Sequence, residues 1–338
     1  MADPKISGPD RSSAARTYAF IAIVLAILIA LPYIANAIGQ PALTSLATRI
    51  TILAIGAASL NLALGYCGLV SFGHAAWYGV GGYVVGIMYR HYVTGDPFLG
   101  MSIGSDQLLV TLPLAILISG FFALVLGALS LRTSGVQFIM ITLAFAQMLF
   151  FFFVALKTYG GDDGLIVRRR NALPFIDTRD GTTFYWICLF FAVAWFALMA
   201  RIVKSRFGRV LEGIRQSERR MAAMGVSTYR YKLACFVISG MGAGMAGALM
   251  ANHARFVSPD MLHWTQSGEF MIMVILGGAG TLFGPAAGAA VLIGLESQLA
   301  AWTEHWQVIL GPLLVLMILF TRGGLSGIAK LLRRGRND

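Results

Sequence analysis

Charge is the scarcest property of this chain. Only 12% of its 338 residues are Asp, Glu, Lys or Arg, whereas 57% are hydrophobic and the mean hydropathy is +0.74. Soluble domains carry about a quarter charged residues, so this composition excludes an ordinary soluble domain. Apolar runs of about 20 residues, the length needed to cross a bilayer, recur from Tyr18 almost to the C-terminus. We therefore expect one all-α polytopic membrane protein.

Cysteine is also scarce, and Cys67, Cys188 and Cys235 stand singly in apolar runs. Without a CxxC spacing they indicate neither a zinc site nor a disulfide framework. Catalytic motifs are missing as well, because the chain has no GxxxxGK[ST] phosphate loop, no HExxH, no GxSxG and no paired-carboxylate cluster. The sequence predicts a non-catalytic chain that binds no metal or cofactor and does not hydrolyse ATP itself.

The apolar runs predict roughly 8–10 transmembrane helices, some of them short or broken. A turn is expected in "GGAGTLFGP", because interior Gly costs about 1 kcal/mol and interior Pro about 3 kcal/mol in a helix. The runs on either side of it form two short spans or a re-entrant pair. The expected spans are Tyr18–Ile38, Thr44–Leu64, Leu69–Tyr89, Leu108–Ser130, Val136–Leu156, Phe184–Val203, Leu233–Ala251, Phe270–Leu282, Ala286–Ala301 and Val308–Phe320.

The few charges are distributed unevenly between the two sides of the membrane. If the N-terminus is inside, the segments on that side hold 18 of the 26 basic residues and a net charge of +13, and the remainder carries −2. Lys and Arg are retained in the cytoplasm, so both termini are expected to be cytoplasmic. The predicted parts are a cytoplasmic tail (1–17), a transmembrane domain (18–321) with a cytoplasmic loop (204–232), and a basic cytoplasmic tail (322–338).

One span concentrates glycine in "GYCGLVSFGHAAWYGVGGYVVG". Such a stretch indicates either a helix that lines a pathway or ordinary tight helix packing. His74 inside it is either a pathway residue or a neutral imidazole that donates a hydrogen bond to a neighbouring carbonyl. Thr142 and Gln147 are five residues apart, so we expect at most one of them to face a cavity. The candidate pathway residues are Ser71, Gly73, His74, Gln137, Thr142 and Gln147.

The longest inside loop contains "SERRMAAMG", which predicts a short helix that ends at Gly225, a common helix stop. Ala222 and Ala223 would give this helix a small face that fits a groove on another protein. The alternative is a basic loop that only anchors the chain at the membrane surface.

Five pieces of the chain, in order, resemble the branched-chain amino acid permeases of ABC importers, in the M-type subfamily. They are "GYCGLVSFGHAAWYGVGGY", "RTSGVQFIMITLAFAQM", "GGDDGL", "EGIRQSERRMAAMGVSTYRYKLACFVISGMGAGMAGAL" and "ILGGAGTLFGPAAGA". The resemblance implies half of an import channel in the bacterial inner membrane. Its implied partners are a second homologous permease subunit, two ATP-binding subunits that use ATP and Mg, and a periplasmic solute-binding protein.

The resemblance also implies that the inside loop docks on the ATPase. The chain departs from the family at Gln137, where an aromatic residue is common, and at Gln216, where Asn or Asp is common. The first departure leaves the substrate open between branched-chain or related amino acids and urea or short amides. A secondary transporter or channel is the alternative from another class, and it would be expected to carry more intramembrane acids. The implied ATPase-coupling residues are Arg215, Glu218, Ala222, Ala223 and Gly225.

Overall fold

The computed structural model describes residues 11–97, 104–174, 176–303 and 305–320, with side chains from residue 24 onward except at 306 and 317–320. The chain divides into two compact units after Ala47. The first contains α1 (Arg11–Ala37) and the start of α2 (Pro41–Asn61), and the second contains everything that follows. The predicted tail at 322–338 and the first ten residues of the predicted tail at 1–17 lie outside the described residues.

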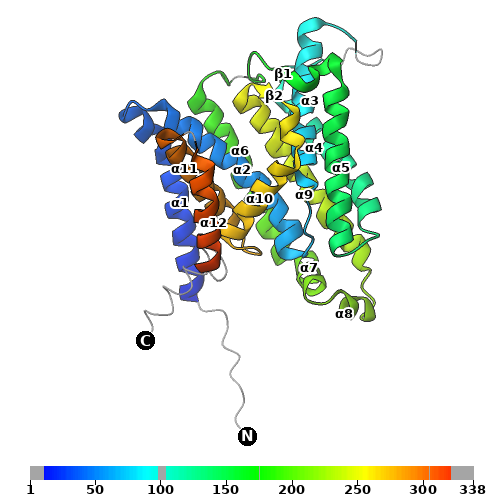
Figure 1. Ribbon diagram of the computed structural model, residues 1–338. Helices are drawn as coiled ribbons and strands as arrows, with labels where there is room; N and C mark the ends of the chain where they lie inside the picture. Colours follow the sequence, from blue (N-terminus) through cyan, green and yellow to red (C-terminus); the bar gives the residue numbers. More distant parts are fainter. Residues whose placement is uncertain (1–10, 98–103, 175, 304, 321–338) are drawn as a thin grey trace. The chain divides into compact units, whose positions relative to one another are not determined.

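The second unit is built almost entirely of helices (Figure 1). Its described strands, β1 (Leu165–Ile166) and β2 (Phe256–Val257), form one short antiparallel pair. After α2 and the π-helix η1 (Leu62–Tyr66), its helices are α3 (His74–Thr94), α4 (Leu108–Ser130), α5 (Val136–Ala155), η2 (Lys157–Tyr159), η3 (Gly161–Asp163), α6 (Gly181–Lys204), α7 (Arg206–Gln216), α8 (Glu218–Ala223), α9 (Thr228–Ala254), η4 (Pro259–Leu262), α10 (Trp264–Gly277), α11 (Gly284–Trp302) and α12 (Trp306–Phe320).

Five helical segments of the described chain are long and apolar enough to cross a membrane: Pro41–Tyr66, α4, α5, α6 and α9. The remaining helices are shorter or less apolar, in keeping with the expectation that some spans are short or broken. The prediction of an all-α polytopic membrane protein is confirmed. The predicted span Leu108–Ser130 coincides with α4.

The predicted start of the third span at Leu69 is wrong. Residues 67–73 form an irregular segment, and α3 begins only at His74. Gly68 has φ +77°, a left-handed conformation that a continuing α-helix does not contain. Gly68 therefore lies in a break between two helices, whereas Gly79, Gly81, Gly82 and Gly86 lie inside α3.

The predicted end of the eighth span at Leu282 is also wrong, because α10 ends at Gly277. Gly278 and Gly280 have φ +107° and +81°, so the chain turns there. The turn expected in "GGAGTLFGP" is confirmed, and it occupies residues 278–283 between α10 and α11.

The innermost helix of the second unit is α3, which packs against α9, α4 and η4. Every residue from His74 to Gly86 is buried. A Cβ atom at Gly81 would collide with the backbone of Gly244 in α9, and one at Gly247 would collide with the Tyr78 carbonyl. These glycines let the two backbones touch, so α3 faces protein and does not need the apolarity of a lipid-facing span.

We expect Gly81→Ala to destabilise the protein, because overpacking a close contact costs about 1–3 kcal/mol. The matched control is Gly294→Ala in α11, where a Cβ atom would meet nothing within 4 Å. Ala is the better helix former, so the control should be neutral or stabilising by up to about 1 kcal/mol. Thermal unfolding of the detergent-purified protein measures both variants. Equal unfolding temperatures would contradict the close approach of α3 and α9.

Candidate functional site

The candidate coupling site consists of two helices, α7 and α8, which connect α6 to α9. They lie at the end of the second unit opposite β1 and β2 (Figure 1). In α7, Gly208, Leu211 and Ile214 are buried at three-residue spacing, so one face of this helix packs on the protein and the other is open.

No residue of α8 is buried. Its first turn is capped by Ser217, whose Oγ accepts a hydrogen bond from the Arg220 N–H at 3.3 Å. Its end is set by Gly225, which has φ +83° and donates its N–H to the Ala222 carbonyl at 3.0 Å. The predicted helix and its stop are confirmed. Ala222 and Ala223 are exposed, so the small face of α8 is uncovered in this chain.

Glu218 ties the start of α8 to α9. Its carboxylate forms an ion pair with Lys232 at 2.5 Å and accepts a hydrogen bond from Thr228 Oγ1 at 3.1 Å. This predicted coupling residue therefore has partners within the chain, and it fixes the position of α8.

Arg215 at the end of α7 also points into the protein. Its Nη1 donates a hydrogen bond to the Gly65 carbonyl at the end of η1. A Cβ atom at Gly280 would lie 2.8 Å from Arg215 Nη1, and one at Gly68 would lie 3.3 Å from Arg215 Cγ. The guanidinium is thus held between the broken end of α2 and the turn after α10.

Two side chains of α9 donate hydrogen bonds to backbone carbonyls of α2 and η1 that precede Gly65. Ser239 Oγ donates to the Ser59 carbonyl, and Cys235 Sγ donates to the Leu62 carbonyl at 3.4 Å. The second of these carbonyls belongs to the π-helix η1, and π-helical turns are frequent at functional sites. With the bond from Arg215, every third carbonyl along this stretch is held by a side chain from α9 or α7.

Asn61, the last residue of α2, connects this region to the turn at 278–283. Its Nδ2 donates to the Thr281 carbonyl at 2.8 Å, and its Oδ1 accepts from the Gly280 N–H at 2.9 Å. The side chain is buried, so these bonds satisfy polar groups that lipid would leave unpaired. We call Asn61, Gly65, Arg215, Gly280 and Thr281 the junction.

Four of the six candidate pathway residues gather around the irregular segment at 67–73. Ser71 Oγ accepts from the Gly73 N–H at 3.1 Å, and Thr142 Oγ1 accepts from the Phe72 N–H at 3.3 Å. Ser267 Oγ of α10 donates to the Phe72 carbonyl at 2.7 Å. Ser71, Gly73 and Thr142 are buried. In this conformation the hydroxyl groups of Ser71 and Thr142 therefore serve as hydrogen-bond partners for the backbone of the irregular segment.

His74, the fourth, is fully buried, and its Nε2 lies 2.6 Å from Ser239 Oγ. The single hydroxyl hydrogen of Ser239 goes to the Ser59 carbonyl. Ser239 therefore accepts from His74, which places a proton on Nε2 of the imidazole. This bond gives His74 a structural role, and its pathway role stays a prediction.

The other two candidates lie apart from this group. Gln137 is exposed near the start of α5, and Gln147 is only partly exposed. Its Nε2 is buried without a hydrogen-bond partner among the described residues. Thr142 faces the buried side of α5 with Phe138 and Ala146. The structure brings Ser71, Gly73, His74 and Thr142 together and does not bring Gln137 or Gln147 to them.

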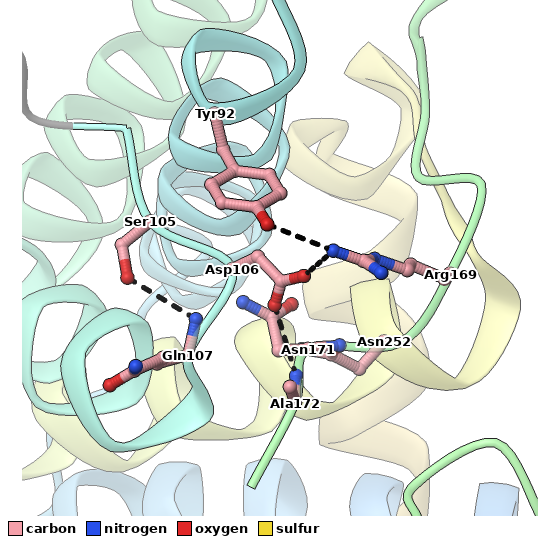
Figure 2. A network of polar contacts seen from close by, with 8 residues as sticks. All are labelled: Tyr92, Ser105, Asp106, Gln107, Arg169, Asn171, Ala172 and Asn252. Carbon is pink, nitrogen blue, oxygen red and sulfur yellow. Dashed lines mark hydrogen bonds and ion pairs between the residues drawn. The ribbon is translucent and has the colours of Figure 1, made fainter.

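A second polar network connects Asp106, just before α4, to the long segment between α5 and α6 (Figure 2). Arg169 pairs with Asp106 and donates to Tyr92 OH at 3.2 Å, and the Asp106 charge raises the pKa of Arg169. Asn252 Oδ1 accepts from the Asn171 N–H at 2.8 Å. The network fixes the long segment between α5 and α6 onto α3, α4 and α9. Near it, Arg169, Arg170, Ala172, Ile176, Asp177, Thr178 and Arg179 line a pocket of about 270 Å³.

Residues 42–319 match the model of the family described as "Branched-chain amino acid transport system / permease component". The chain belongs to this permease family. No solved structure matches the permease significantly.

The curated relatives that match most of the chain are M-type permeases. It is similar to the high-affinity branched-chain amino acid transport system permease protein LivM of Salmonella typhimurium, with 27% identity over 90% of this chain and 74% of the relative. LivM of Escherichia coli K12 is 26% identical over the same shares. A probable LivM of Methanocaldococcus jannaschii is 24% identical over 75% of this chain and 80% of the relative. The similarity to Salmonella typhimurium LivH, 28% identity, covers only 42% of this chain and 46% of the relative.

Sequence reasoning missed the polar residues that hold the permease together from inside its apolar runs. Asn61 falls inside the predicted span Thr44–Leu64, and Asn252 directly follows the predicted span that ends at Ala251. A polar amide at such a position needs partners in the protein. An asparagine in or beside a predicted span was therefore a signal for a buried hydrogen-bond network, but the sequence does not reveal its partners.

We expect Arg215→Met to loosen the junction, because an unsatisfied buried carbonyl at Gly65 costs about 1–3 kcal/mol. Arg219→Met, on exposed α8, is the control. The measurements are the unfolding temperature in detergent and hydrogen exchange in the segment after η1. If both variants leave exchange in that segment unchanged, Arg215 does not hold the junction.

Proposed function

We propose that the permease is the membrane-spanning subunit of an ATP-driven ABC importer for branched-chain or related amino acids, and that it couples to a cytoplasmic ATPase through α8. It forms half of the translocation pathway in the bacterial inner membrane. The chain needs no cofactor of its own, because ATP and Mg are used by the partner ATPase. The LivM relatives, whose names state branched-chain amino acid transport, support this substrate class.

The observation that carries the coupling proposal is the exposed helix α8 with fixed ends. A helix of six residues is too short to be stable alone in water. Here Ser217 caps it, Gly225 ends it, and Glu218 pairs with Lys232. The result is a preorganised projection that presents Ala222 and Ala223, and preorganisation reduces the entropy lost on docking.

The link from α8 to the transmembrane helices runs through α7. Arg215 joins the end of α7 to Gly65, and Asn61 joins the same region to the turn at Gly280. A displacement of α8 by an ATPase would therefore act on the broken end of α2 and on the α10–α11 turn. Relatives of both the LivM and LivH types support a second homologous permease subunit as partner. Two ATP-binding subunits and a periplasmic solute-binding protein complete the proposed assembly.

The coupling proposal predicts that Ala223→Trp and Gly225→Val prevent docking while the subunit still inserts. Tryptophan overfills a fitted contact, at a cost of about 1–3 kcal/mol, and Val at φ +83° strains the chain where α8 ends. The matched control is Gly95→Val, which replaces a glycine at φ +73° that also has open space around it, after α3. The measurements are membrane abundance, co-purified ATPase, and ATP hydrolysis stimulated by the binding protein.

Normal abundance with lost ATPase association in the two α8 variants, and normal association in Gly95→Val, supports coupling through α8. Full ATPase association and full uptake in both α8 variants would reduce this loop to a charged anchor.

The uneven distribution of charge predicts the orientation. Reporter fusions after Arg209 and after Arg336 should report the cytoplasm, and a fusion after Asp163 should report the outside. Fusions at Asp163 and Arg209 that report the same side would contradict both the orientation and the cytoplasmic position of α8.

A further inference from the structure

The pocket of about 270 Å³ in the segment between α5 and α6 belongs neither to the junction nor to α8. Three arginines are part of its lining: Arg169, Arg170 and Arg179. We call it the arginine pocket. Its volume is slightly below the range of about 300–1,000 Å³ that is typical of pockets for drug-sized ligands. The arginine pocket therefore suits a single small group, such as a phosphate.

The guanidinium of Arg170 is held in one orientation by the chain. Its Nη1 donates to the carbonyls of Thr178, Arg179 and Asp180 at 3.3, 3.1 and 3.3 Å. Its Cζ lies 4.6 Å from the centroid of the Phe184 ring, and Phe184 is buried. These contacts leave one edge of the planar group unused, the edge formed by Nε and Nη2.

The unused edge of Arg170 has no protein partner in the part of the chain that the structure describes. Its Nε is buried without a hydrogen-bond partner there, and the described hydrogen bonds of this side chain all use Nη1. A buried donor that stays unpaired is costly. The Nε–Nη2 edge matches two oxygens of a carboxylate or a phosphate, so an oxyanion would satisfy it.

The arginine pocket also carries more positive charge than its acids offset. Asp106 pairs with Arg169, and Asp177, the acid in the lining, accepts a hydrogen bond from the Arg179 N–H at 2.9 Å. Among the described residues, no ion pair includes Arg170 or Arg179. At least one guanidinium of the pocket therefore has no counter-ion within the described chain, which favours an anion as ligand.

The arginine pocket lies beside the start of a membrane span. Arg179 is two residues before α6, which is about 36 Å long at 1.5 Å per residue and can cross a bilayer core of about 30 Å. Most of α6 is unburied in this chain, and Phe190 is 67% exposed. Its last turn carries Arg201 and Lys204. Basic residues thus flank the apolar helix at both ends, which puts the pocket at the depth of lipid head groups.

We propose that the arginine pocket binds the phosphate of an anionic phospholipid. The phosphate oxygens bind the Nε–Nη2 edge of Arg170, Arg179 adds a second positive charge, and the acyl chains lie along the exposed apolar side of α6. The bound lipid holds the segment between α5 and α6 at the membrane surface. This inference goes beyond the proposed function and does not depend on what the permease transports.

The test titrates the full-length, detergent-purified permease with phosphatidylglycerol, which is anionic, and with phosphatidylcholine, whose head group has no net charge. Native mass spectrometry counts the bound lipid and gives both Kd values. We expect phosphatidylglycerol to bind about tenfold more tightly. Arg170→Gln removes the charge and the planar fork, and it should raise the Kd for phosphatidylglycerol about tenfold, because one charge-assisted pair is lost.

Arg179→Gln is the second pocket variant, for the case that Arg170→Gln disturbs the segment. Arg179 is exposed, so its substitution should leave the fold intact and still raise the Kd several-fold. Arg168→Gln is the matched control, because Arg168 is exposed, makes the same change of charge and is not part of the pocket lining. It should leave the Kd unchanged. The unfolding temperature without lipid shows that each variant is folded.

Unchanged phosphatidylglycerol binding in both pocket variants overturns the proposal. An equal loss of binding in Arg168→Gln also overturns it, because the lipid would then follow the general surface charge. Inorganic phosphate that displaces the lipid at equal concentration would assign the pocket to a free anion instead. Retained lipid binding with lost association of the binding protein in the assembled transporter would assign it to an acidic protein partner.

Discussion

Every backbone N–H and C=O at membrane depth must find a partner inside the protein, because lipid tails offer none. This chain interrupts its helices at 67–73 and at 278–283 and supplies the missing partners from side chains. Thr142 and Ser267 bind the backbone of Phe72, and Asn61 binds the turn at Gly280. The first role of the polar residues in these apolar runs is therefore to supply hydrogen bonds to the interrupted backbone.

The same requirement connects the interior to the candidate coupling helix. Arg215 reaches the Gly65 carbonyl from α7, which continues through Ser217 into α8. A point charge on a flexible stem would tolerate relative motion of these elements, whereas the planar guanidinium fixes direction as well as distance. The proposed contact with an ATPase and the break in α2 are thus two ends of one short chain of contacts.

The sequence predicted whatever depends on neighbours along the chain. Apolar runs located most of the helices, "SERRMAAMG" predicted α8, and Gly225 marked its end. Contacts between distant residues were not predictable, because Arg215 and Gly65 are 150 residues apart and Asn61 and Gly280 are 219 apart. Glycine was read correctly as a breaker at 278–283. The glycine-rich stretch from Gly65 to Gly86 was read as one helix, although η1 ends at Tyr66 and α3 begins only at His74. Glycine serves both purposes in membrane helices, and only its φ angle separates them.

The contact between Gly81 of α3 and Gly244 of α9 limits how this unit can move. Two backbones that touch at glycines have no side chains that can change rotamer, so sliding one helix along the other would drive main-chain atoms together. Shear between α3 and α9 is therefore blocked, and the pair moves as one body. Hinge rotation stays open to this unit at Gly68, Gly278 and Gly280, where the backbone has positive φ values that other residues rarely adopt.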